Sequence, residues 1–273
     1  MLDAFARSMA KVGDGGLRPG VTLPTVRDLT GRVLSGRYEL EALIGEGTFG
    51  RVYRGHDRRL ARTVAIKVIK PWWTNHPEWV KAFEHEAQML ARLSDPGVVQ
   101  IFDVGRARRE LYYVAEFVDG ENLATRLRRG PLPPWQACEI AEQLCRALAQ
   151  AHEQGVVHRD IKPANVLISS QGKVKLSDFG VARLAEGTPD SPTGSIVGTP
   201  RYMAPEHAQG LRTTPASDVY SVAVVLCDML AGAAAIKSES AVDARATLPA
   251  GTPQTLVQIV ERALAKDPGD RYQ

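Results

Sequence analysis

Strand-like and helix-like patterns are segregated along this chain, and their order limits the folds that it can adopt. From Arg37 onward come segments rich in β-branched and aromatic residues: YELEALIGEG, RVYRG, TVAIKVIK and QIFDVGRARRELYYVAEFV. Such segments predict β-strands. After Gly120, residues 134–154 place apolar side chains on one face, begin at a proline and end beside a glycine, as helices do. The sequence therefore predicts an α+β fold in two lobes, with most strands in the first.

One helix interrupts the strands, and its pattern suggests a partner for a buried lysine. Residues 77–93 have helical periodicity, and one face carries Trp79, Phe83, Glu86 and Leu90. In the strand VAIK, Lys67 shares a face with apolar residues, and a buried ammonium group needs an ionic partner. Glu86 lies on the apolar face of the helix and is the first choice for this partner, and Glu84 is the second.

Composition is typical of a soluble globular protein. Of 273 residues, 44% are hydrophobic and 24% are charged, which allows a substantial core. The net charge of +3 is small and no basic stretch is interleaved with aromatics, so no nucleic-acid partner is expected. The odd number of cysteines, 3, argues against a disulfide framework and favours a reducing compartment. We expect Cys138, Cys145 and Cys227 to fill the core.

The longest apolar segment, residues 219–236, has two interpretations. Its length is near the lower limit for a membrane span. However, Asp228 lies inside it and Ser221 near its start, so a helix buried in a large core is favoured. The first residues of the chain have no sustained apolar run and do not resemble a secretory signal. We therefore expect no membrane contact within this chain.

Glycines recur in IGEGTFGRV, where Gly45, Gly47 and Gly50 form a G-x-G-x-x-G pattern. Glycines let main-chain N–H groups approach phosphates without an intervening side chain. By itself the pattern is equally compatible with an ordinary turn. A dinucleotide-binding fold would continue into a helix, whereas the strand-like RVYRG follows here. The glycines are therefore predicted to form the tip of a hairpin.

Further motifs follow the glycines in order: VAIK, ending at Lys67, HRDIKPAN at 158–165, SDFG at 177–180 and APE at 204–206. From about Tyr38 to Tyr272 the chain thus resembles a eukaryotic-type (Hanks-type) serine/threonine protein kinase catalytic domain of the bacterial branch. The resemblance implies a bilobal kinase fold. Its small lobe is an antiparallel β-sheet with one key helix, and its larger lobe is mainly helical.

The resemblance also implies domain boundaries. Residues 37–118 would form the small lobe and residues 119–273 the large lobe, while residues 1–36 would be a flexible arm. Relatives carry a longer stretch with a docking helix after Leu230, so substrate docking is expected to differ here. They also continue beyond the final DRYQ, so we expect a large lobe truncated at its C-terminal helix. A membrane anchor or sensor beyond residue 273 stays open.

The family transfers the γ-phosphoryl group of ATP to protein Ser and Thr hydroxyls in signalling, and matching residues receive roles from it. Asp160 would accept or orient the proton of the substrate hydroxyl, beside Lys162, which would neutralise charge on the transferred group. Lys67, fixed by Glu86, would hold the α- and β-phosphates. Oxygen donors of two further residues would hold Mg²⁺, or Mn²⁺ as an alternative. These metal ligands are Asn165 and Asp178.

The resemblance implies an ATP site between the lobes, made by the glycine loop, by apolar positions around adenine and by main-chain groups of a hinge. These residues are Ile44, Gly45, Glu46, Gly47, Thr48, Phe49, Gly50, Val52, Ala65, Leu167, Glu116 and Val118. Ala115 occupies the position behind adenine where relatives usually carry a larger residue. A cavity is therefore expected there.

Other matches concern substrate type and the bracing of the large lobe. Thr199 matches a threonine that contacts the catalytic loop and favours Ser/Thr substrates. Glu206 and Arg271 match a buried ion pair, and Asp218 matches a residue that tethers the catalytic loop. Arg159 matches an arginine that pairs with a phosphorylated residue in the activation loop.

We expect the domain to phosphorylate its own activation loop. Thr193 is the first candidate, and Ser191 and Ser195 are the second choices. The alternative is that these hydroxyls only form turns. The resemblance implies two kinds of partner: protein substrates, and a second copy of the chain paired through the small lobes. We expect the chain to act in the cytoplasm.

Two other functions compete with that of an active kinase. A pseudokinase scaffold would bind ATP without transfer, but scaffolds usually lose one of three residues that are all present here: Lys67, Asp160 and Asp178. A small-molecule phosphotransferase of similar fold would lack the APE segment. The sequence therefore favours the active protein kinase.

Overall fold

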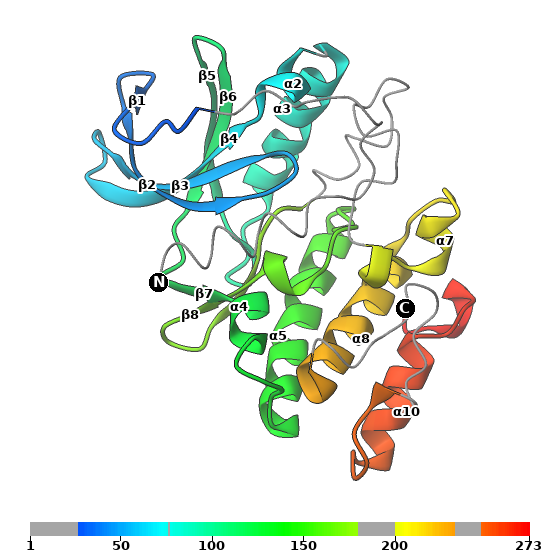
Figure 1. The fold of residues 1–273 in the computed structure, drawn as a ribbon. Helices are drawn as coiled ribbons and strands as arrows, with labels where there is room; N and C mark the ends of the chain where they lie inside the picture. The colour runs from blue at the N-terminus through cyan, green and yellow to red at the C-terminus, as the bar shows by residue number, and fades with distance from the viewer. Residues whose placement is uncertain (1–26, 76, 180–199, 233–246) are drawn as a thin grey trace, which may run out of the picture.

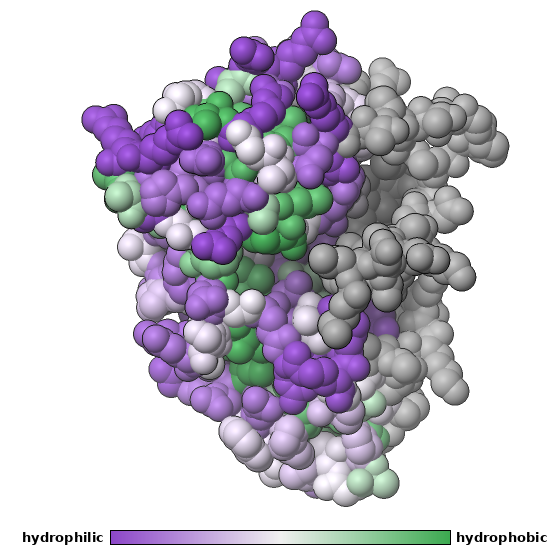
Figure 2. Space-filling model, turned by 60° about the vertical axis from the view of Figure 1, so that its left-hand side comes forward, coloured by the Kyte–Doolittle hydropathy of each residue, from purple (hydrophilic) through white to green (hydrophobic). Residues whose placement is uncertain are grey.

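A computed structural model describes residues 27–75, 77–179, 200–232 and 247–273 of the chain. The described elements form a sheet-rich lobe, which contains the early strands, and a helical lobe, which contains α5, α8 and α10 (Figure 1). This arrangement confirms the predicted α+β, two-lobed fold. Hydrophilic residues cover most of the face shown in Figure 2, while hydrophobic ones gather along its middle.

The small lobe is built on a 6-stranded sheet in the order β1-β2-β3-β4-β6-β5. Every neighbouring pair is antiparallel. Two helices follow β4 before the chain returns to the sheet. The bounds are β1 Val33–Leu34, β2 Tyr38–Glu46, β3 Gly50–Asp57, β4 Arg62–Ile69, α2 Pro71–Thr74, α3 Pro77–Arg92, β5 Ile101–Ala107 and β6 Glu110–Glu116.

The glycine pattern forms the tip of the β2–β3 hairpin, as the sequence predicts. Glu46 pairs with Arg51 across the hairpin, and the N–H of Gly47 donates to the carbonyl of Gly50 over 2.9 Å. A Cβ atom at Gly50 would lie 2.5 Å from the main-chain oxygen of Val68. Only glycine therefore lets β3 approach β4 so closely at this position.

The helix predicted at residues 77–93 is α3. Its apolar side chains Trp79, Phe83 and Leu90 are buried, as their spacing predicts. Trp79 and Phe83 join a small-lobe cluster with Trp73 of α2. The helix thus packs on the sheet through a row of large side chains.

The large lobe holds a 3-stranded sheet, in the order β7-β8-β9, beside its helices. Its core joins side chains of α5, α8 and the short strands in one cluster. The strands are β7 Gly120–Asn122, β8 Val166–Ser169 and β9 Val174–Leu176. The helices are α4 Leu123–Leu127, α5 Pro134–Glu153, η1 Pro163–Asn165, η2 Pro200–Tyr202, α7 Pro205–Ala208, α8 Pro215–Ala231, α10 Gln254–Ala263 and η3 Pro268–Asp270.

The cysteine prediction is wrong for two of the three residues. Cys227 is fully buried in α8, whereas Cys138 and Cys145 are exposed on α5. The buried face of α5 includes Ala137 and Leu144, each one position before a cysteine. One position corresponds to about 100° around a helix, so both thiols turn away from the core.

The apolar segment forms a buried helix, as favoured above, over the part that the structure describes. Residues 215–231 form α8, and Val224, Val225 and Met229 are 0% exposed. Its polar residues are buried too, because each has a partner in the large lobe. Ser221, for example, donates to the carbonyl oxygen of Tyr202 over 2.7 Å. Within the described residues, no helix is both long enough and apolar enough to cross a membrane.

Candidate active site

The loop between α5 and β8 gathers three of the predicted residues. The ammonium group of Lys162 lies 2.7 Å and 3.0 Å from the two carboxylate oxygens of Asp160. The amide of Asn165 donates to the main-chain oxygen of Asp160 over 2.8 Å and to its Oδ2 over 3.0 Å. The Asp160 carboxylate is thereby held in one orientation, with Oδ1 accepting fewer hydrogen bonds than Oδ2.

Asp218 tethers this loop from α8. Its carboxylate is 1% exposed. It accepts hydrogen bonds from the main-chain N–H groups of His158, over 2.8 Å, and Arg159, over 2.9 Å. Arg159 has a φ of 68°, which a non-glycine residue adopts only under constraint. The carboxylate supplies that constraint.

His158 links the loop to the segment that carries Asp178. Its ring is buried and lies 4.3 Å from the ring of Phe179, measured between centroids. Nδ1 accepts from the N–H of Asp160 over 3.2 Å, so Nε2 carries the proton and donates to the carbonyl of Ser177 over 3.1 Å. Burial lowers the pKa of His158, which keeps the ring in this neutral form.

Cross-strand register places the predicted nucleotide residues on one face of the small-lobe sheet. Val52 pairs with Lys67, and Ala65 pairs with Ala115. Because side chains alternate along a strand, Ala65 and Lys67 share a face, and their partners share it with them. Tyr113, the partner of Lys67 on β6, lies on this face too.

Lys67 reaches from this face to Asp178. Its ammonium group lies 2.6 Å from Oδ1 of Asp178, and its side chain is 8% exposed. The hydroxyl of Tyr113 donates to the same oxygen over 2.7 Å. Burial tends to raise the pKa of the Asp178 carboxyl. However, the charge of Lys67 and the hydrogen bonds from Lys67 and Tyr113 outweigh it, so the pKa lies below its usual value.

The donor set suits a metal held partly by phosphates. No group of three or more His, Cys, Asp or Glu side chains among the described residues could hold a metal by itself. Mg²⁺ is commonly bound by one or two protein oxygens together with nucleotide phosphates. The hydrogen bonds above use the amide nitrogen of Asn165 and Oδ1 of Asp178. Oδ1 of Asn165 and Oδ2 of Asp178 therefore remain as oxygen donors for a cation.

The other predicted nucleotide residues have mixed environments. Ile44 is 49% exposed on β2, while Val52, Ala65 and Leu167 are half-buried. Glu46 is ion-paired with Arg51 over 3.0 Å, which ties the two sides of the glycine loop together. Beside the predicted hinge, the side chain of Glu116 pairs with Lys175 over 2.8 Å.

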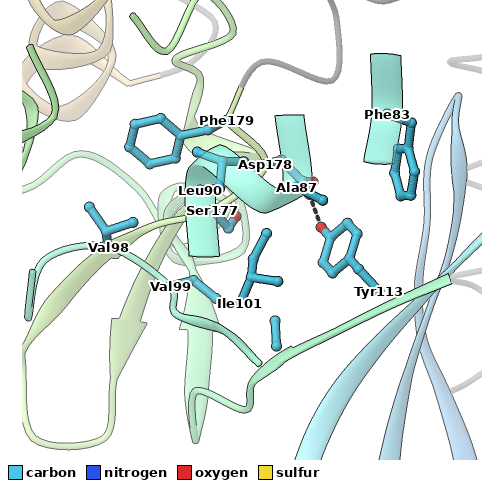
Figure 3. A pocket seen from close by; sticks show the side chains of 11 residues that line it. Phe83, Ala87, Leu90, Val98, Val99, Ile101, Tyr113, Ser177, Asp178 and Phe179 are labelled. Carbon is cyan, nitrogen blue, oxygen red and sulfur yellow. Dashed lines mark hydrogen bonds between the residues drawn. The ribbon is translucent and has the colours of Figure 1, made fainter. Parts of the chain in front are cut away.

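The cavity expected beside Ala115 is present. It has a volume of about 40 Å³ and lies between α3, β6 and the Ser177–Phe179 segment (Figure 3). Phe83, Leu90 and Phe179 are among the residues that line it. A larger side chain at position 115 would project into this space.

Two carboxylates of the large lobe anchor the segment around the APE motif. Glu206 and Arg271 form the predicted pair, with oxygen-to-nitrogen distances of 2.8 Å and 2.9 Å. The second anchor was not predicted. Asp228, fully buried in α8, pairs with Arg201 and accepts a hydrogen bond from the hydroxyl of Tyr202 over 2.7 Å. The sequence signal for this anchor was an aspartate inside an apolar segment, because a buried carboxylate needs hydrogen-bond partners.

Several predicted residues lie outside the residues that the structure describes. The side chain of Glu86 is one, so its pairing with Lys67 stays a prediction, and the described partner of Lys67 is Asp178. The others are Thr193, Ser191, Ser195 and Thr199. Tyr113 was missed, although it lies two residues before Ala115 and alternation places both on one face.

Comparisons with known proteins agree with this geometry. Residues 38–273 match the family described as the protein kinase domain. The chain is 39% identical over 256 residues to serine/threonine-protein kinase PknA of Mycobacterium tuberculosis, covering 89% of this chain and 59% of the relative. It is 38% identical over 257 residues to serine/threonine-protein kinase PrkC of Bacillus subtilis, covering 90% of this chain and 40% of the relative.

A solved structure has the same fold. The Mycobacterium tuberculosis PknI kinase domain superposes with a TM-score of 0.70 at 26% sequence identity, covering 90% of this chain and 94% of that one. The chain therefore spans almost all of a kinase domain, but less than two thirds of the curated relatives that it matches.

Proposed function

Because the chain belongs to the protein kinase domain family, we propose that it transfers the γ-phosphoryl group of ATP to Ser and Thr hydroxyls of proteins. The curated relatives are named serine/threonine-protein kinases. The observation that carries the proposal is the arrangement of Asp160, Lys162 and Asn165 on one loop, with Lys67 and Asp178 paired nearby. These groups belong to both lobes, as a reaction between a nucleotide and a protein substrate requires.

Asp160 is the group that would receive the proton of the attacking hydroxyl. Its Oδ2 already accepts from Lys162 and Asn165, whereas Oδ1 accepts only from Lys162. Oδ1 thus has more capacity to accept a further hydrogen bond from a substrate hydroxyl. Lys162 stays within reach of the negative charge that develops on the transferred group. Positioning and charge stabilisation of this kind supply most of the catalysis in phosphoryl transfer.

Members of this family use ATP and a divalent cation, and we propose Mg²⁺, with Mn²⁺ as an alternative. Asn165 and Asp178 would hold the cation, whose chemical contribution is to neutralise phosphate charge. Lys67, already fixed by Asp178, would contact the phosphates. The glycine loop would cover them with main-chain N–H groups.

We extend the proposal to regulation, assembly and location. Phosphorylation of the activation loop, chiefly at Thr193, would order that loop through Arg159. Two copies would pair through their small lobes, where Leu60 and Phe102 are exposed by 55% and 37%. The boundaries at residues 37–118 and 119–273 agree with the change from the large sheet to the helical lobe after β6. We place this activity in the cytoplasm, where ATP is supplied.

The test compares the chain with its Asp160→Asn variant, both produced in a bacterial host that lacks phosphatases. We expect phosphate-sized increments in the intact mass of the parent and none in the variant. Peptide mapping would then locate the modified residues and test Thr193 against Ser191 and Ser195. Equal increments on both proteins would contradict the proposed role of Asp160. No increment on the parent, even after incubation with Mg²⁺ and ATP, would contradict self-phosphorylation.

A further inference from the structure

An unexpected hydrogen bond joins the small-lobe sheet to the proposed metal ligand. Tyr113 of β6 points at the segment that carries Asp178, and its hydroxyl donates to the carboxylate (Figure 3). The acceptor is Oδ1, the oxygen that Lys67 also contacts, over 2.6 Å. Two donors thus converge on one carboxylate oxygen.

The hydroxyl of Tyr113 and the ammonium group of Lys67 approach the same carboxylate oxygen of Asp178, over 2.7 Å and 2.6 Å. A carboxylate that accepts on Oδ1 from both Lys67 and Tyr113 cannot rotate freely. Its other oxygen, Oδ2, then keeps a constant direction.

A column of stacked aromatic rings, formed by Phe83, Trp79 and Trp73, packs against the ring of Tyr113. The ring of Tyr113 lies 6.1 Å from that of Phe83 in α3, with the planes 27° apart. Phe83 stacks in turn on Trp79 at 5.4 Å and 13°. The three side chains are buried to different depths but belong to one contiguous cluster.

The column continues to the glycine loop. Trp79 stacks on Trp73 of α2 at 5.5 Å, and the ring of Trp73 lies 5.1 Å from that of Phe49 at the loop tip. The indole N–H of Trp73 also lies 3.4 Å from the main-chain oxygen of Thr48. Aromatic pairs of this kind add specific packing energy beyond burial.

We propose that Tyr113 is a positioning residue that orients Asp178 for the metal–nucleotide complex, and that the aromatic column couples its position to the glycine loop. The inference rests on the proposed function, because it takes Asp178 as a metal ligand. It adds a residue that the kinase motifs do not include. It also explains why so many large rings are clustered between Phe49 and Tyr113.

The test measures how strongly a metal tightens nucleotide binding. The dissociation constant of a non-hydrolysable ATP analogue is determined by calorimetry with excess Mg²⁺ and again with a chelator, and the ratio of the two values is the metal effect. Tyr113→Phe removes only the hydroxyl. We expect it to reduce the metal effect about tenfold, because a buried hydrogen bond to a charged group is lost. Binding in the chelator should change less than twofold.

Tyr112→Phe is the matched control. Tyr112 lies next to Tyr113 on β6, but its hydroxyl donates to Ser35 over 2.7 Å in the core of the sheet. Both variants lose one buried tyrosine hydroxyl. Only Tyr113→Phe should change the metal effect, although both should lower the melting temperature of the free protein.

Trp79→Phe tests the column. The ring contacts of Trp79 are with Trp73 and Phe83, and its indole nitrogen has no hydrogen-bond partner within the described structure. We expect this variant to reduce the metal effect about threefold, and to have no effect once Tyr113→Phe is present, because its influence passes through the hydroxyl. If Tyr113→Phe does not fold, Trp79→Phe alone decides the question.

The outcomes separate the two proposals. A parent protein whose nucleotide affinity does not respond to Mg²⁺ would overturn the proposed metal site and the role of Tyr113 together. A parent that responds, with Tyr113→Phe responding equally or more strongly, would overturn only the role of Tyr113. Equal losses in Tyr113→Phe and Tyr112→Phe would also overturn it, since a general loosening of the sheet would then be the cause.

Discussion

The site contains two aspartates that are held in different ways. Asp218 is buried in α8 and accepts from main-chain N–H groups of His158 and Arg159, and it also lies 2.8 Å from Nε2 of His152. Within the described residues, Asp178 accepts hydrogen bonds from the side chains of Lys67 and Tyr113, which come from the other lobe. Main-chain donors are fixed by the fold, whereas side-chain donors can rotate away. The loop that carries Asp160 is thus fixed within the large lobe, whereas the proposed metal ligand depends on the position of the small lobe.

This difference predicts a large loss of stability when Asp218 is replaced. Asp218→Asn exchanges one carboxylate oxygen for an NH₂ group. Because the N–H groups of His158 and Arg159 donate to different oxygens of Asp218, one of them loses its acceptor. We expect the free energy of unfolding to fall by about 3 kcal/mol, measured by urea denaturation.

Glu142→Gln makes the same chemical exchange at a surface pair. Glu142 and Arg146 are 62% and 78% exposed, so the change should cost about 0.5 kcal/mol or less. Similar losses in the two variants would refute the idea that Asp218 is a structural anchor.

The small lobe has a buried carboxylate of its own, that of Asp57 in β3. Hydrogen bonds from Arg37 lower the pKa of Asp57 to about 2. A lowered pKa stabilises the fold above about pH 4, and this contribution, about 2 kcal/mol, is lost as the pH falls toward 2. Asp57→Asn should be less stable at pH 7 and should lose less stability between pH 4 and pH 2. If the free energy of unfolding of Asp57→Asn falls as steeply across that pH range as that of the parent, this prediction is wrong.

The cavity beside Ala115 leaves room on the small-lobe side of the site for a larger side chain or for a bulky group of a bound compound. Ala115→Met should fill part of the roughly 40 Å³ beside Phe83 and Phe179. We expect an ATP-competitive compound with a bulky group in this space to bind about tenfold more weakly. ATP itself, measured in parallel, should bind within twofold of the parent. Unchanged binding of the bulky compound would show that the cavity is not used.

Within the site, Lys67 gives a small expected effect on stability. Asp178 is 28% exposed and keeps its hydrogen bond from Tyr113, so Lys67→Met should change the free energy of unfolding by about 1 kcal/mol or less. Transfer of phosphate should nevertheless be lost, as measured by incorporation of labelled phosphate. If Lys67→Met lost as much stability as Asp218→Asn, the contrast drawn between Asp178 and Asp218 would be wrong.

Much of the fold could be predicted because it depends on local patterns. Period-two alternation placed Lys67 and Ala65 on one face of a strand, and helical spacing placed Trp79 and Phe83 inside. The strand that follows the glycines predicted a hairpin. The same periodicity should have placed Cys138 and Cys145 outside, since both lie one position away from the buried face of α5.

The sequence alone determined the order of the elements, the hairpin and the chemical type of the site residues, because these follow from neighbouring residues. Only the tertiary structure decided which side chains meet. Lys67 and Asp178 are separated by 111 positions, and Tyr113 and Asp178 by 65. Such contacts depend on how α3, β6 and the loops pack in three dimensions, and no local period records that packing. The partners of Asp178 were therefore visible only once the chain was folded.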